Sequence, residues 1–308
     1  MPPAALPSPT RRALLAFAAF VAALFLFVNR PAYQSFFAED DLDNMANARG
    51  LKAPDIAYTL ARPGVSGEGN FRVGAEIYYW ALVRVAGLNY WPYIAGIHAI
   101  HLLNVLLIWL LARALGAEIA GACAAALLYA FHAAAFDIYW KSMYIFDLLC
   151  ATYAIAALLA YVRGRILLSI VLFWLALRSK EVVIFFPVVL AAYEWLLGEG
   201  KWKRLVPFFA ISLIVGLQGA AANLHRSGDY AFRIRAAAQW QAASFYAGKL
   251  LVLPFAGFAV LLVPFVARSR RVWFGVIVFV VLLAPMLFFP GRLFAAYLYV
   301  PLDRKSVV

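Results

Sequence analysis

Apolar segments of nearly membrane-spanning length recur along the whole chain, and they restrict its fold more than any other feature. A helix needs about 20 apolar residues to cross the hydrocarbon core, with a range of roughly 17–25. Hydrophobic residues make up 66% of the 308 positions, whereas soluble domains have about 45–50%. We therefore predict an all-α polytopic membrane protein with a single transmembrane domain over residues 1–308. About nine or ten spans are expected, at 13–29, 93–112, 118–136, 144–161, 166–178, 182–198, 204–222, 244–266, 272–290 and a partial one from 293.

The connections between these segments fall into two sets, which predict how the chain crosses the membrane. One set is short and basic, and its members alternate along the chain as loops on one side must. Cytoplasmic loops carry an excess of Lys and Arg, so we place this set and the N-terminus in the cytoplasm. The basic connections are PTRR at 9–12, VRGR at 162–165, GEGKWKR at 198–204 and ARSRR at 267–271. The longer connections, beginning with residues 30–92, then face the outer side.

Four acids follow the first expected span closely, in FFAEDDLDNM at 36–45. Carboxylates near hydrocarbon are costly unless something uses or pairs them. Asp40 or Asp41 could be a general base that takes the proton of an attacking hydroxyl. A second acid could hold the acceptor or a divalent metal. Either aspartate could equally be the N-cap of a helix that begins in LDNMANARG.

The outer loop of residues 30–92 is long enough to have structure of its own, because long loops in compact proteins are usually functional or structured. Within it, AEIYYWALVRVAGL at 75–88 has apolar residues at helical spacing. A helix of this kind lies along a membrane surface. We therefore predict membrane-surface helices in this loop.

The sequence RSKE at 178–181 places cations at an expected helix junction on the outer side. Arg178 could bind a phosphate through two parallel hydrogen bonds from its guanidinium, and Lys180 could bind it as a compact positive charge. Glu181 would then hold the lysine in position. The alternative is a structural ion pair between helices.

Histidines within the apolar segments allow two interpretations. His98, His101 and Asn104 share one helix face. His132 and Asp137 lie near the outer end of the next expected span. Interhelical hydrogen bonding is favoured over a metal site, because an i, i+3 spacing without nearby cysteine is poor support for zinc.

The formal charge of +12 does not indicate nucleic acid, because the basic residues are scattered between apolar runs. Anionic membrane lipids and phosphate-bearing substrates are the expected partners. Cys123 and Cys150 both lie inside apolar runs, which argues against a disulfide framework or a cysteine metal site.

Taken in order, several stretches resemble the GT-C superfamily of membrane glycosyltransferases, most closely the transmembrane O-mannosyltransferases with TPR repeats and their bacterial relatives. EDD is similar to the family's first-loop acidic motif, and RSKE lies in the best-matching stretch. Val73 and Ala133 stand where the family usually has proline. The matching stretches are EDD at 39–41, NFRV at 70–73, WPYIAGIHAIHLLN at 91–104, YAFHAAAFDIYWKSMYIFDLL at 129–149, LALRSKEVVIFFPVVLAAYEWLL at 175–197 and PGRLFAAYLYVP at 290–301.

The resemblance implies a GT-C-like bundle in a bacterial cytoplasmic membrane. It implies an inverting glycosyltransferase that moves a sugar from a polyprenyl-phosphate carrier to an acceptor protein, lipid or glycan at the outer face. Asp40, with Asp41 as the alternative, would be the catalytic base. No cofactor is expected, because polyprenyl phosphate is already a good leaving group, and a divalent metal stays an open alternative. Residues expected to bind the donor phosphate are Arg72, Lys180, Arg178 and Arg226, and those expected to support the site are Glu181, His101, His132 and Asp147.

Two other functional classes stay open. A transporter or flippase of polyprenyl-linked glycans would use the same basic outer face without needing the acid pair. An inactive, truncated relative is the other, because the family continues with further helices where this chain stops at DRKSVV.

Overall fold

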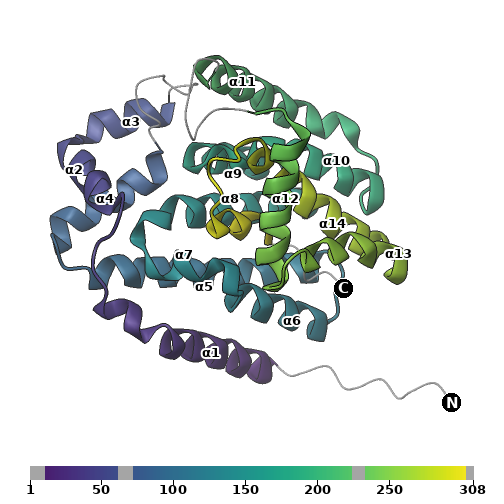
Figure 1. Ribbon diagram of the computed structural model, residues 1–308, viewed down its shortest axis with the longest axis horizontal. Coiled ribbons are helices and arrows are strands. Elements are labelled where there is room, and N and C mark those ends of the chain that lie inside the picture. Colours follow the sequence, from purple (N-terminus) through teal and green to yellow (C-terminus); the bar gives the residue numbers. More distant parts are fainter. Residues whose placement is uncertain (1–10, 62–71, 224–232, 303–308) are drawn as a thin grey trace.

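The computed structural model describes residues 11–61, 72–223 and 233–302, and every regular element in these ranges is helical (Figure 1). The first four α-helices are α1 (Arg11–Val28), α2 (Asp41–Gly50), α3 (Ala53–Ala61) and α4 (Val73–Ala86). The next six are α5 (Trp91–Ala114), α6 (Ile119–Ala130), α7 (Phe136–Trp140), α8 (Ile145–Val162), α9 (Ile166–Ser179) and α10 (Phe186–Leu196). The last five are α11 (Val206–Asn223), α12 (Ala236–Leu251), α13 (Val263–Ala267), α14 (Arg270–Leu283) and α15 (Tyr299–Leu302).

Within the described residues, five helical segments are long and apolar enough to cross a membrane, and the number rises to seven if two bent pairs each count as one span. An integral membrane protein made of helices is therefore supported. Nine or ten spans were expected. The difference lies in α9 and α10, which are helical but have only 14 and 11 residues, and in the C-terminal region, where α15 has four.

The expected span at 244–266 is broken. α12 ends at Leu251, and the chain turns by 89° before the segment that begins at Ala256. Pro254 explains the break, because proline has no N–H to donate to the carbonyl of Leu250 and its ring clashes with that carbonyl. The freed carbonyl of Leu250 instead accepts a hydrogen bond of 3.1 Å from Nε2 of His132.

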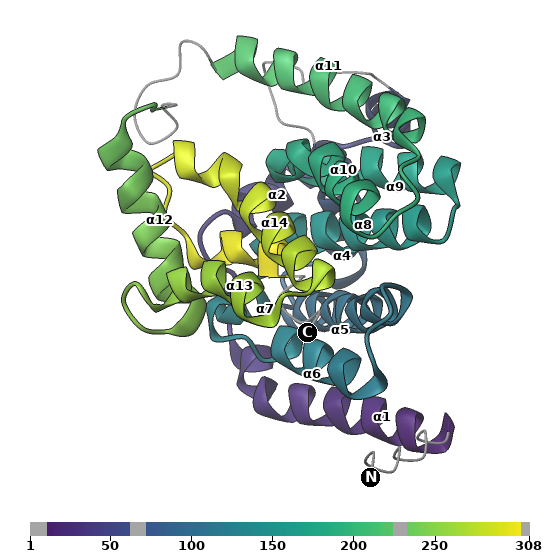
Figure 2. The ribbon, with the colours of Figure 1, turned by 90° about the vertical axis from the view of Figure 1, so that its right-hand side faces the viewer.

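The centre of the bundle is α8. It lies against α5 and α9, and 72% of the apolar stretch that contains it is buried inside the protein. Alanines at 151, 154 and 157 are almost fully buried and let the neighbouring helices approach closely. Figure 2 shows α1 and α11 at opposite margins of the bundle. Only 11% of the apolar stretch in α1 is buried, and only 17% of the apolar stretch that includes α11.

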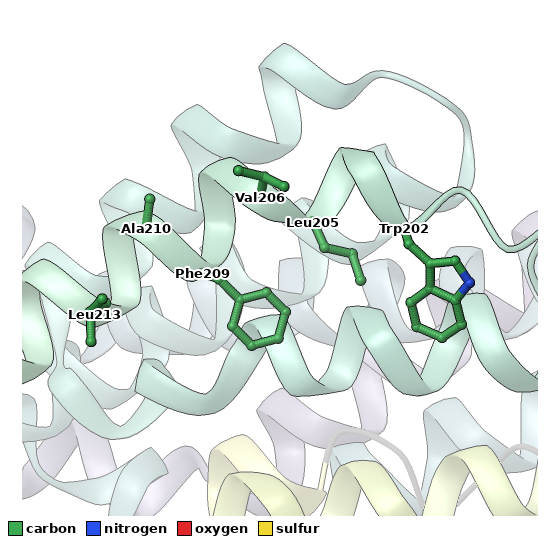
Figure 3. A pocket seen from close by; sticks show the side chains of 6 residues that line it. All are labelled: Trp202, Leu205, Val206, Phe209, Ala210 and Leu213. Atoms are coloured by element: carbon green, nitrogen blue, oxygen red, sulfur yellow. The ribbon is translucent and has the colours of Figure 1, made fainter.

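A shallow apolar hollow of about 550 Å³ runs along α11 and the helical turn that precedes it (Figure 3). One helical stripe provides all of its lining: Trp202, Leu205, Val206, Phe209, Ala210 and Leu213. An apolar stripe on a marginal helix is the surface that lipid chains cover. None of the residues of the expected site lines this hollow, and we assign it to the lipid-facing surface.

Described connections of the two sets lie at opposite ends of the α8 span. At one end Tyr161 donates a hydrogen bond of 2.7 Å to Glu194, which also accepts the backbone N–H of Lys201. At the other end, the hydroxyl of Ser142 donates a hydrogen bond to the carboxylate of Asp41. Ser142 and Tyr161 belong to the same 21-residue span, so these contacts mark its two ends. We call the end with Asp41 the α2–α4 end, because it carries α2, α3 and α4, on the left in Figure 1.

The expected orientation predicts which end a membrane-impermeant thiol reagent will reach. In a chain without Cys123 and Cys150, Asn47→Cys on α2 should be labelled from outside intact cells. Lys203→Cys, in the basic connection at 198–204, should be labelled only after the membrane is opened, because basic loops stay in the cytoplasm. The opposite labelling pattern would contradict the orientation.

Candidate functional site

The α2–α4 end gathers two groups of charged side chains. The first is a tight turn of residues 38–41, which we call the acid turn. The second, which we call the basic cluster, consists of Arg72, Glu76, Asp147, Arg178, Lys180 and Glu181. Most of the residues expected from the sequence fall into these two groups.

Asp41 is the buried anchor of the acid turn. Its side chain is inaccessible to solvent. One carboxylate oxygen accepts hydrogen bonds from the hydroxyls of Tyr79 (2.7 Å) and Ser142 (2.6 Å). The other accepts the backbone N–H of Ala38 at 3.0 Å. Three donors satisfy this carboxylate, so its role in the fold is to join α2 to α4 and to the start of the α8 span.

Asp40 is held differently, although it is the next residue. It occupies the N-cap position of α2, and its side chain is exposed and makes no capping hydrogen bond. Only its backbone carbonyl takes part in the helix, by accepting the N–H of Asn44 at 2.9 Å. The structure thus separates two aspartates that the sequence left equivalent, and Asp40 is the one whose carboxylate can meet a ligand.

Glu39 completes the acid turn. Its φ angle of 52° places it in the left-handed region, which is rare for a residue with a side chain. Its carboxylate pairs with the ammonium of Lys141 at 2.6 Å. Lys141 and Ser142, which are consecutive in the chain, therefore hold Glu39 and Asp41 on either side of Asp40.

In the basic cluster, Lys180 pairs with Asp147 at 2.6 Å, and the side chains are only 13% and 4% exposed. The ammonium also lies 4.5 Å from the centre of the Tyr297 ring. Glu181 was expected to hold this lysine, and that pairing is wrong. The backbone at Lys180 is extended (φ −161°, ψ 140°), so successive side chains point to opposite sides and Glu181 faces away from it.

Glu181 instead pairs with Arg72, whose Nη2 lies 3.1 Å from the carboxylate. Arg72 precedes α4 and also lies over the ring of Phe146. The exposed fractions of 26% and 40% make this pair looser than the one at Lys180. Arg178 lies near Glu76 and over the ring of Trp174, at 5.9 Å. Arg226, the fourth expected phosphate ligand, lies outside the described residues.

Two features place the acid turn and the basic cluster within reach of each other. Ser142 contacts the acid turn, and Asp147 belongs to the basic cluster. These two residues are five positions apart in one helical span, so they are separated by about 8–10 Å along the helix axis. Tyr144 lies between them, within the electrostatic reach of Glu39, Asp137 and Asp147. α4 joins the groups in the same way, through Arg72 at its start and Tyr79 in its middle.

Sequence reasoning missed Glu76, which lies one turn into α4. One of its oxygens accepts the backbone N–H of Arg72 at 3.2 Å, and the other is buried without a hydrogen-bond partner. Burial raises the pKa of Glu76 from 4.5 to about 7, although the N–H of Arg72 and the charges of Arg178 and Arg72 act in the opposite direction. A single glutamate in an amphipathic stretch gives no signal of this in the sequence.

The raised pKa of Glu76 predicts a pH dependence of stability. Folded protein keeps a proton that unfolded protein releases between about pH 4.5 and 7, so stability should fall as pH rises through this range and then level off. The melting temperature in detergent should therefore fall more between pH 5 and 8 for the wild type than for Glu76→Gln, which cannot titrate. The exposed acid Asp43 offers a matched control, because Asp43→Asn should leave the wild-type slope unchanged. Equal slopes for Glu76→Gln and wild type would contradict the assignment.

The histidines expected to support the site are engaged elsewhere. His101 has its two ring nitrogens 2.7 Å from the Tyr299 hydroxyl and 3.3 Å from the carbonyl of Ala130. His132 accepts the N–H of Ala134 and donates to Leu250. Nε2 therefore carries the proton in both rings, because it faces a carbonyl. Both histidines satisfy carbonyls at helix breaks, which agrees with the structural interpretation.

Within the described ranges, no three side chains of His, Cys, Asp or Glu come close enough together to hold a metal ion. Tyr79, Ser142 and Lys141 are further site residues that the sequence did not single out. In the sequence, the stretch YAFHAAAFDIYWKSMYIFDLL at 129–149 was singled out for His132, Asp137 and Asp147. The position of Lys141 and Ser142 directly before an expected span was the feature of the sequence that could have pointed to them.

Comparisons with protein-family models, with curated proteins and with solved structures found no match for this chain. A function for it therefore has to be argued from its residues and from their arrangement.

Proposed function

We propose that this protein is an inverting glycosyltransferase that uses a polyprenyl-phosphate sugar, built as a GT-C-like bundle in a bacterial inner membrane with its N-terminus in the cytoplasm. The observation that carries the proposal is the acid turn. It leaves one carboxylate, Asp40, free between two neighbours that are held in place, at the same end of the bundle as Arg72 and Lys180 of the basic cluster. A base beside an anion site is the arrangement that sugar transfer from a phosphate carrier requires.

In the proposed reaction, Asp40 takes the proton of the acceptor hydroxyl as that oxygen attacks the anomeric carbon. The bond between the anomeric carbon and the phosphate oxygen breaks, and its electron pair leaves with the polyprenyl phosphate. A single displacement of this kind inverts the anomeric centre. Lys180 and Arg72 then stabilise the negative charge that builds up on the leaving phosphate.

The two cations differ in how readily they can take a phosphate. The Arg72–Glu181 pair is partly exposed, and pairs of this type contribute only about 0–1 kcal/mol to stability. A phosphate can replace Glu181 at Arg72 with two parallel hydrogen bonds to the guanidinium. Lys180 is buried against Asp147, so its ammonium group is held in a fixed position beside the site and can donate its remaining hydrogen bonds there. We assign the first phosphate contact to Arg72, and we keep Arg178 and Arg226 as further candidates.

The proposal is tested by following a labelled sugar. Membranes that contain the wild-type chain should move label from a polyprenyl-phosphate sugar to an acceptor, with inversion at the anomeric carbon. Membranes with equal amounts of Asp40→Asn should not. A label that crosses the bilayer still on its carrier would instead favour a flippase, and retention of anomeric configuration would overturn the single displacement.

A further inference from the structure

The acid turn is closed by hydrogen bonds at its ends while its first inner residue is strained. The N–H of Asp41 donates to the carbonyl of Ala38 at 3.1 Å, and the carboxylate of Asp41 accepts the N–H of Ala38 at 3.0 Å. Between them, Glu39 has a φ of 52°. This conformation brings Cβ too close to the following carbonyl oxygen, so it persists only where surrounding contacts enforce it.

Lys141 supplies such a contact from a distant part of the chain. Its ammonium lies 2.6 Å from the Glu39 carboxylate. The pKa of Lys141 is raised, chiefly by this hydrogen bond, and the charge of Asp137 acts in the same direction. Lys141 is therefore a stable cation, and the hydroxyl of the next residue, Ser142, fixes the other end of the turn through Asp41.

We propose that Lys141 is a positioning residue, which holds Glu39 in its left-handed conformation and thereby orients the Asp40 carboxylate towards the acceptor. The part of this inference that concerns catalysis rests on the proposed function. The hydrogen bonds between Asp41 and Ala38 fix the two ends of the turn. The ion pair is the contact that acts on the strained residue itself. A displaced base is costly to a reaction, because a shift of about 1 Å can slow it by about 10²-fold.

Glycine provides a direct test, because it adopts the left-handed conformation without steric cost. Lys141→Gln should lower kcat by about tenfold with the donor KM unchanged, and Lys141→Arg should retain most of the activity. Glu39→Gly should make the lysine dispensable. The double variant Glu39→Gly/Lys141→Gln should therefore recover most of the kcat that Lys141→Gln loses.

Hydrogen exchange gives a measurement that does not depend on activity. In Lys141→Gln, the amides of Ala38 and Asp41 should exchange roughly two- to fivefold faster, in keeping with a partly exposed ion pair. The double variant should return them to the wild-type rate, and high salt should reduce the difference between wild type and Lys141→Gln.

The two measurements distinguish the possible failures. Exchange that follows the predicted order, in a protein that transfers no sugar, would overturn the proposed function and the catalytic part of this inference, while the role of Lys141 in the turn would stand. Unchanged exchange in Lys141→Gln would overturn the positioning role whatever the activity. A loss of kcat in Lys141→Gln that Glu39→Gly does not restore would also overturn it, and would show that Lys141 acts on the substrate directly.

Discussion

Asp40→Asn should slow sugar transfer by about 10²–10⁴-fold while leaving the amount and stability of the protein unchanged. Asparagine has nearly the size of aspartate but cannot accept a proton at neutral pH. The side chain of Asp40 is exposed and makes no capping hydrogen bond, so the substitution removes no contact of the fold. The measurement is the rate of transfer from a labelled donor, beside the melting temperature in detergent.

Asp41→Asn is the matched comparison, because it makes the same chemical change one residue away. The amide would place N–H groups against the hydroxyl donors of Tyr79 and Ser142, or against the N–H of Ala38. Hydrogen bonds to charged groups contribute about 1.5–3 kcal/mol each, so this variant should lose stability. Normal transfer by Asp40→Asn would remove Asp40 as the base, and loss of transfer in Asp41→Asn without loss of stability would give that role to Asp41.

Lys180→Met should lower the free energy of unfolding by about 3–5 kcal/mol, because it leaves the buried carboxylate of Asp147 without its cation. Asp147 is only 4% exposed, so water cannot replace the lost partner. The melting temperature in detergent and the yield in membranes measure this effect. Arg72→Met should have a much smaller effect on stability, because the Arg72–Glu181 pair is partly exposed.

The double variant Lys180→Met/Asp147→Leu separates stability from function. Replacing both members of a buried pair by apolar residues of similar size is often neutral for stability. We therefore expect the fold to recover while binding of the polyprenyl-phosphate donor stays weak, because the ammonium group that would donate hydrogen bonds to the phosphate is gone. Donor affinity equal to that of the wild type in this variant and in Arg72→Met would remove the basic cluster from the donor site.

The predicted spans show what hydropathy can and cannot locate in this chain. Segment length and apolar content located α1, α5, the α8 span and α14 closely, because a helix in lipid must satisfy its own backbone and present apolar side chains. The same reasoning treated 244–266 as one span. It missed the break because hydropathy does not register the missing N–H of Pro254, nor that His132 would donate to the freed carbonyl of Leu250.

The ion pairs show a second limit of sequence reasoning, which placed the charged residues at one end of the bundle but paired them wrongly. The sequence indicated that Lys180, Arg72, Asp147 and Glu181 belong at one end of the bundle. It paired Lys180 with its neighbour Glu181, because adjacent residues are the only proximity that a sequence contains. The extended backbone at Lys180 separates these two side chains.

The sequence was enough to predict a helical chain with several segments long and apolar enough to cross a membrane, and to predict that the acids and cations of the expected site gather at one end. Both follow from local composition, since a helix in lipid needs a run of apolar residues whatever its neighbours are. Only the tertiary structure decided which carboxylate is free. Asp40 and Asp41 are equivalent in the sequence, and they differ because Tyr79 and Ser142, from two other helical segments, reach one of them and not the other. That selection depends on how α4 and α8 are rotated and placed beside the acid turn, which is fixed by packing across the whole bundle.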